Sequence, residues 1–100
     1  MKNKEIIYVR SGFQDGELYF DIDRDIYTQE NGEWLIDEIK RRIHNIQKYN
    51  SKYKNNKYVV NLFREEDGKY NVEVKIYTDG KVKVITMKNR VLKIKMDGGD

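Results

Sequence analysis

Residues 32–49 read GEWLIDEIKRRIHNIQKY, and this stretch decides the fold. Isoleucine recurs in it at intervals of three and four positions, at Ile36, Ile39, Ile43 and Ile46. Such spacing places the isoleucines on one face of an α-helix, with Leu35 and Tyr49 flanking the same stripe. Asn31-Gly32 would also suit a hairpin turn, but the periodicity favours a helix with Asn31 as its N-cap. We therefore predict one amphipathic helix over residues 32–49.

Strands are predicted on both sides of this helix. Before it, two alternating runs flank Asp15-Gly16, a pair that favours tight hairpins because Gly tolerates positive φ. After it, turn signals at Asp67-Gly68, Asp79-Gly80 and Lys88-Asn89-Arg90 separate four further strands, at about 58–63, 70–77, 82–87 and 91–96. The predicted class is α+β: an N-terminal β-hairpin, the helix, and a four-stranded antiparallel meander packed on the isoleucine stripe.

The length of 100 residues predicts a single α+β domain over residues 1–100, with residues 97–100 as a frayed tail. At 38% hydrophobic and 37% charged residues, the chain has material for one modest core. A winged-helix-like fold is the alternative, with the Asp79-Gly80 hairpin as its wing. It ranks second because only one convincing helix is found where that fold has three.

Several classes of protein are disfavoured by composition. The chain has no cysteine, which excludes disulfides, thiolate zinc sites and cysteine nucleophiles. No apolar run approaches the roughly 18 residues of a membrane span, so we expect no membrane partner and a cytoplasmic location. The frequent Lys, Asn, Ile and Tyr are typical of AT-rich genomes, which suggests a phage, a plasmid or a low-GC bacterium as the source.

Catalytic and metal-binding patterns are weak throughout. His44 is the only histidine, and it has no partner for a triad or a zinc site. Asp21, Asp23 and Asp25 alternate as in a calcium loop, but the positions that need Gly and a bidentate Glu hold Ile26 and Gly32. We predict a protein that is not an enzyme and that has no cofactor and no metal site.

Charge is distributed unevenly along the chain. Residues 1–39 hold 4 basic and 10 acidic groups, residues 40–64 hold 8 and none, and residues 65–100 hold 8 and 7. The net charge of +3 therefore conceals an acid-free central segment. Such polarisation steers charged partners more than it decides folds.

The acid-free segment predicts nucleic-acid binding, with duplex DNA as the expected ligand. Lysine neutralises phosphates, amides and hydroxyls bond phosphates or base edges, and tyrosine rings stack on unpaired bases. The predicted binding residues are Lys40, Arg41, His44, Lys48, Lys52, Tyr53, Lys54, Asn55, Asn56 and Lys57. Two plainer interpretations remain: the bases at the helix end suit its dipole, and the loop has the composition of any exposed loop in an AT-rich organism.

A protein-interaction module is the alternative function, such as a phage-encoded inhibitor of a host enzyme. Its support is a set of aromatic side chains that could serve as exposed anchors: Tyr8, Phe13, Tyr19 and Trp34. The sheet face away from the helix would be polar and mainly cationic, with Glu73, Lys75, Tyr77, Lys81, Lys83, Lys93 and Lys95. Unpaired edges of a six-stranded sheet would also allow a homodimer.

Overall fold

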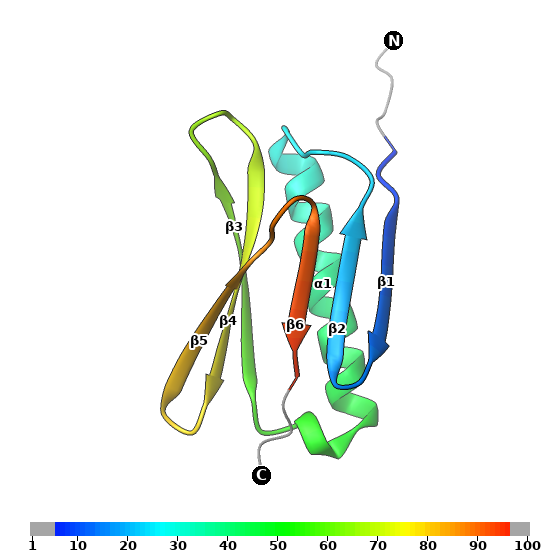
Figure 1. Cartoon of the computed structure of the whole chain (residues 1–100), viewed down its shortest axis with the longest axis vertical. Helices are drawn as coiled ribbons and strands as arrows, with labels where there is room; N and C mark the ends of the chain where they lie inside the picture. Colours follow the sequence, from blue (N-terminus) through cyan, green and yellow to red (C-terminus); the bar gives the residue numbers. More distant parts are fainter. Residues whose placement is uncertain (1–5, 97–100) are drawn as a thin grey trace.

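The computed structural model describes residues 6–96, and within them one α-helix packs against two antiparallel sheets of three strands each (Figure 1). The elements in chain order are β1 (Val9–Gln14), β2 (Glu17–Ile22), α1 (Gln29–Tyr49), the short 3-10 helix η1 (Ser51–Tyr53), β3 (Lys57–Arg64), β4 (Tyr70–Thr78), β5 (Lys81–Thr86) and β6 (Val91–Lys95). One sheet has the order β1-β2-β6 and the other β3-β4-β5. The predicted α+β class and N-terminal hairpin are confirmed, whereas the predicted tail at 97–100 lies outside the described residues.

Helix α1 begins one turn earlier than predicted. Thr28 is the N-cap, and its hydroxyl oxygen accepts a hydrogen bond of 3.2 Å from the backbone N–H of Asn31. Asn31 therefore lies in the first turn and is not the cap. The start at Gln29 places Gly32 in the first turn of the helix, where a Cβ would come within 2.7 Å of the Leu62 side chain. This glycine lets α1 approach β3 closely.

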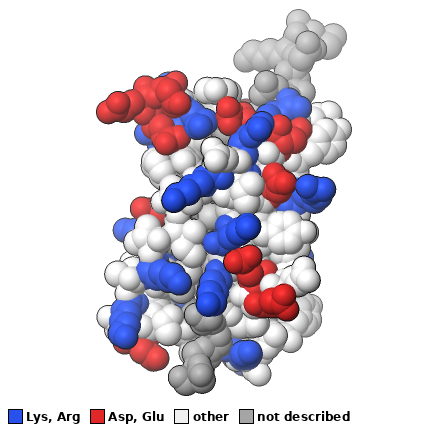
Figure 2. All heavy atoms as spheres, in the orientation of Figure 1, with Lys and Arg blue, Asp and Glu red and all other residues white. Residues whose placement is uncertain are grey.

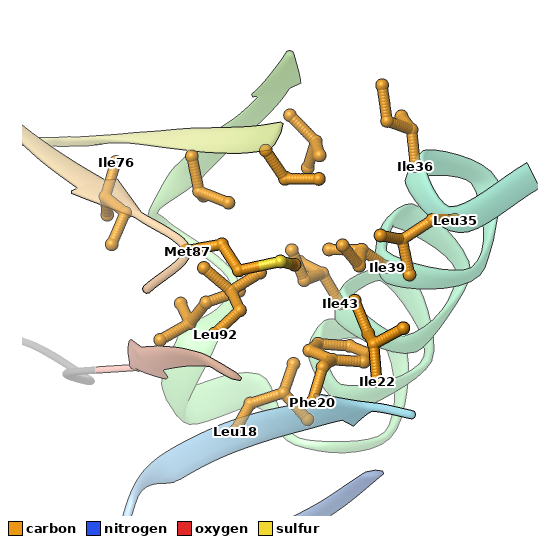
Figure 3. Packing of buried hydrophobic residues seen from close by; sticks show 14 of the residues in the cluster. Leu18, Phe20, Ile22, Leu35, Ile36, Ile39, Ile43, Ile76, Met87 and Leu92 are labelled. Atoms are coloured by element: carbon orange, nitrogen blue, oxygen red, sulfur yellow. The ribbon is translucent and has the colours of Figure 1, made fainter. Parts of the chain in front are cut away.

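The core has three walls, formed by α1 and the inner faces of the two sheets (Figure 3). From α1, Ile39 and Ile43 project toward Phe20 of β2, with Leu92 of β6 and Met87 between the sheets. All five side chains are buried. The predicted isoleucine stripe therefore faces the core, and its burial stabilises the fold by roughly 1.5–3 kcal/mol per large side chain.

The predicted four-stranded meander is wrong in its last strand. Strands β3, β4 and β5 form a meander, but β6 leaves them and pairs with β2, with Ile94 opposite Leu18 and Leu92 opposite Phe20. One physical reason lies in β5, because its inner-face positions next to Ile76 and Thr78 are Lys83 and Lys81. Two lysines there cannot be covered by another apolar strand without burying charge.

A second reason lies in the turn between β5 and β6. Its central residues, Asn89 and Arg90, both have positive φ, as in a type I′ turn. The Arg90 side chain donates to the backbone oxygen of Asp23 at 3.2 Å, and the N–H of Ile22 donates to the Arg90 carbonyl at 2.9 Å. These contacts attach the turn to the end of β2, so β6 starts beside β2 and diverges from β5 (Figure 1).

The winged-helix alternative is also wrong, since the described residues contain a single α-helix that packs on two antiparallel sheets. Within residues 6–96, no helix combines the length and the apolar character needed to cross a membrane.

Candidate nucleic-acid interface

Most of the predicted binding residues lie on the outer face of α1 and around its C-terminal end. We name this set the helix–loop basic surface; it comprises Lys40, Arg41, His44, Lys48, Lys52, Lys54, Asn55 and Lys57, all of which are exposed. They lie on the exposed side of α1, in the loop that follows it, or, for Lys57, at the start of β3. The structure thus brings eight of the ten predicted residues to the surface.

The loop after α1 is folded. Asn50 caps η1 by accepting a hydrogen bond of 3.2 Å from the N–H of Lys52. Gln47, on the last turns of α1, donates through Nε2 to the backbone oxygens of Tyr53 and Asn56, both at 2.7 Å. Because one amide group ties two loop carbonyls to the helix, the lysines of this loop stand on a fixed backbone.

The structure places Tyr53 and Asn56 in the interior. Tyr53 is 5% exposed, and its ring meets Phe13 edge-on with 5.7 Å between centroids. Asn56 is 8% exposed, and its side-chain oxygen accepts a hydrogen bond of 3.1 Å from the Thr78 hydroxyl. Neither side chain presents itself to a ligand, so a role for them in binding does not fit their burial. They hold the loop in place.

A different tyrosine is exposed at this surface. Tyr49, the last residue of α1, is 79% exposed, and the Lys48 ammonium lies 5.4 Å from the centroid of its ring. Tyr49 was expected to flank the apolar stripe, but among the described residues it is not part of the buried core. The signal that could have found it is its position at the very end of the helix, beyond Ile46, the last isoleucine of the stripe.

Two arginines of α1, one of them a member of this surface, are less available to an anion than the lysines. Arg41 forms an ion pair with Glu38 one turn earlier on the helix. Arg42 is half-buried, and its Nε is buried without a hydrogen-bond partner among the described residues. The lysines differ: within residues 6–96, no ion pair is formed by Lys48, Lys52, Lys54 or Lys57. These four are the charges most available to an anion.

The acidic and basic halves of the outer helix face are far enough apart to act separately. Asp37 and Lys48 are 11 positions apart, which is about 16 Å along the helix axis. Charges in solvent are largely screened beyond about 8 Å at physiological salt. Asp37 therefore opposes an anion near Lys40 but hardly affects one near Lys48, and the site is strongest around the C-terminal end of α1.

The three alternating aspartates each lie beside an arginine. Asp21 pairs with Arg10 at 3.3 Å, Asp25 with Arg90 at 4.0 Å, and Asp23 with Arg24 at 3.2 Å. The Arg24 hydrogen bond lowers the pKa of the Asp23 carboxyl below its usual value against an opposing effect of burial, and the N–H of Tyr8 adds to the lowering. Among the described residues, no group of three acidic or histidine side chains converges as metal ligands would.

Comparison with protein-family models, curated proteins and solved structures finds no match for this chain. The function is therefore inferred from the geometry and chemistry of the protein's own surface.

Proposed function

We propose that the protein binds nucleic acid through the helix–loop basic surface, with duplex DNA as its main ligand. The observation that carries the proposal is a group of four exposed lysines that form no ion pair among the described residues. Lys48 lies on the last turn of α1, Lys52 and Lys54 lie in the loop that Gln47 ties to the helix, and Lys57 begins β3. A backbone that is already held in place loses little further conformational entropy on binding, and each lysine that neutralises a phosphate releases counterions. A phage, plasmid or low-GC bacterial origin and a cytoplasmic location belong to the same proposal.

The lysines contact phosphates, and Asn55 and His44 add polar contacts at the rim of the surface. Tyr49 supplies a ring for stacking on an unpaired base, with Lys48 beside it. Four neutralised phosphates on duplex DNA correspond to a slope of log affinity against log salt of roughly −3 to −4. Binding of this kind is independent of sequence, with dissociation constants of about 10⁻⁴ to 10⁻⁶ M at physiological salt.

The test is fluorescence anisotropy with labelled duplex DNA, single-stranded DNA and duplex RNA at two salt concentrations. The test variant is Lys48→Glu/Lys52→Glu/Lys54→Glu, and the matched control is Lys81→Glu/Lys83→Glu/Lys93→Glu. Both variants take the net charge from +3 to −3, because each replacement removes one positive and adds one negative charge. We expect the first variant to lose binding and the second to retain most of it. Equal losses in both variants would mean that only net charge matters, and no binding at low salt would reject the proposal.

For the alternative function, a protein-interaction module, three of the four aromatic residues named are exposed: Tyr8, Phe13 and Trp34. The Phe13 ring also packs edge-on against Tyr53, and the Tyr19 ring lies over Gly12. The surface that favours a protein partner is the open edge between β5 and β6.

A further inference from the structure

A second acid-free segment covers the end of the chain that the structure describes. Between Gly80 and Met96 there is no Asp or Glu, and the six basic residues are Lys81, Lys83, Lys88, Arg90, Lys93 and Lys95. The charge count over residues 65–100 does not reveal this segment, because the acidic residues of that region lie before Gly80 or after Met96. Figure 2 shows one face of the molecule, on which Lys and Arg gather over β5 and β6 and acidic groups lie mainly toward the upper left and the right.

A groove separates β5 from β6 where the two strands diverge. Among the described residues the strands are bridged only at Lys88 and Val91, beside their connecting turn. Beyond this bridge lies a hollow of about 460 Å³. We name it the β5–β6 seam; its lining residues are Val84, Ile85, Thr86, Lys88, Val91 and Lys93. The lining is apolar and cationic and holds no acidic group.

Backbone groups of β5 point into the seam. The N–H of Met87 donates to the oxygen of Val72 on β4 at 3.0 Å, and the register continues with Ile85 opposite Val74. Bonding directions alternate along an antiparallel strand. The N–H and C=O groups of Val84 and Thr86 therefore point away from β4, toward the seam.

The opposite wall of the seam is built in the same way. The N–H of Ile22 on β2 donates to Arg90 just before β6, and the register then places Leu92 opposite Phe20. By the same alternation, the backbone of Lys93 points away from β2. Two open strand edges thus face one another across the groove, which is the geometry that accepts an added strand.

Side chains on β5 are also unusual for a free edge. Val82 is 55% exposed and Val84 is 52% exposed, and they alternate with Lys81 and Lys83. Lysines on an edge strand protect it from random pairing, which explains the lysines but not the exposed valines or the groove. A second copy of this chain would bring lysines against lysines, so like charge opposes it. A partner strand that carries both apolar and acidic side chains would cover the exposed valines and pair with the lysines.

We propose that the β5–β6 seam docks an extended acidic segment of a partner protein, which adds a strand to the edge of β5. Main-chain hydrogen bonds to Val84 and Thr86 hold the segment. Its apolar side chains cover Val84 and Ile85, and its carboxylates pair with Lys88 and Lys93. This proposal is independent of nucleic-acid binding at the helix–loop basic surface, because the two surfaces share no residue.

The experiment uses the full chain and a labelled synthetic peptide of about eight residues that alternates Val and Glu, long enough to cover a strand of this length. Anisotropy measures its affinity, and amide chemical shifts of isotope-labelled protein locate it. A peptide that alternates Val and Lys is the charge control. We expect only the acidic peptide to bind, with the largest shifts at Val84, Thr86 and Lys93. Absence of binding, or shifts centred elsewhere, would overturn the proposal.

A pair of proline variants tests the main-chain contact. Val84→Pro removes an amide that faces the seam, and Val82→Pro removes one on the same edge but outside the groove lining. Neither removes a hydrogen bond to β4, and proline is tolerated on edge strands in this orientation. We expect Val84→Pro to weaken peptide binding about tenfold, and Val82→Pro, at the end of the edge away from the groove lining, to weaken it less. Equal effects would contradict strand addition at the seam.

Lys88→Glu/Lys93→Glu leaves the backbone unchanged and keeps the test valid if a proline variant fails to fold. It should also weaken the acidic peptide about tenfold, whereas Lys48→Glu/Lys54→Glu on the helix–loop basic surface should leave it unchanged. Two further outcomes would reject the proposed partner. Duplex DNA that shifts the same amides and displaces the peptide would assign the seam to nucleic acid. A dimer in sedimentation velocity that is lost in Val84→Pro would assign it to a second copy.

Discussion

The helix–loop basic surface and the β5–β6 seam have similar charge but differ in whether their backbone hydrogen-bonding groups are already satisfied. Both come from acid-free segments, and both expose lysines. At the first, Gln47 and the caps of η1 satisfy the loop backbone internally, so only side chains remain for a ligand. At the second, two strand edges leave backbone groups directed at solvent. Lysine content alone therefore does not select a ligand, because a backbone with its hydrogen bonds satisfied leaves only side chains for phosphates, whereas an open strand edge suits an extended peptide.

The largest expected effect comes from replacing, one at a time, Tyr49 at the end of α1 and Tyr53 in η1. Tyr53→Ala should lower the free energy of unfolding by about 3–5 kcal/mol, because a buried aromatic ring leaves a cavity. Tyr49→Ala should change it by less than about 0.5 kcal/mol but weaken binding to single-stranded DNA. Urea denaturation and anisotropy measure the two effects. Similar stability losses in both variants would contradict the assignment of Tyr53 to the core and Tyr49 to the surface.

Releasing the loop after α1 from Gln47 should leave backbone groups of the helix–loop basic surface without internal partners, as at the β5–β6 seam. Gln47→Ala removes two hydrogen bonds to loop carbonyls and should destabilise the protein by about 1–3 kcal/mol. Amide hydrogen exchange in residues 50–57 should become faster. The control is Gln29→Ala, since the exposed Gln29 amide donates only to the Glu33 side chain at 3.2 Å among the hydrogen bonds described. If both glutamine variants exchange alike, the loop is not held by Gln47.

Salt dependence should separate the two surfaces in a single titration series. Removing one of the lysines proposed to contact phosphates, as in Lys54→Ala, should reduce the salt slope of duplex DNA binding by about 1. The matched change at the seam, Lys93→Ala, should leave that slope unaltered. A slope that falls equally in both variants would show that DNA covers the seam as well.

The smallest effect is expected at Asp23, which belongs to neither surface. Its carboxylate has a lowered pKa in the folded protein, so its contribution to stability is present above the unfolded pKa of about 3.9 and is lost as pH falls toward the folded pKa. Asp23→Asn should flatten the dependence of unfolding free energy on pH below about 4 and leave both binding activities intact. Denaturation curves at acid pH measure it. A steeper dependence in the variant would contradict this sign.

Local pattern predicted the elements better than their partners. The isoleucine period located α1, and the Asp-Gly pairs located three hairpin turns, because both signals act within a few residues. The pairing of β6 with β2 was missed because it depends on contacts between Arg90 and Asp23, 67 positions apart. Charge along the chain likewise located exposed lysines, but the same argument wrongly placed Tyr53 and Asn56 at the surface, where composition cannot tell a folded loop from an open one.

The α+β class, the buried face of α1 and the two acid-free segments can therefore be read from the amino-acid sequence, since they follow from residue order and short-range periodicity. Only the tertiary structure decided that the strands divide into two sheets, that Tyr49 and not Tyr53 is exposed, and that β5 and β6 enclose an open seam. The reason is physical. Strand pairing and the hydrogen bonds of Gln47 to the loop depend on contacts between residues that are not neighbours in the sequence, and a local sequence pattern does not determine such contacts.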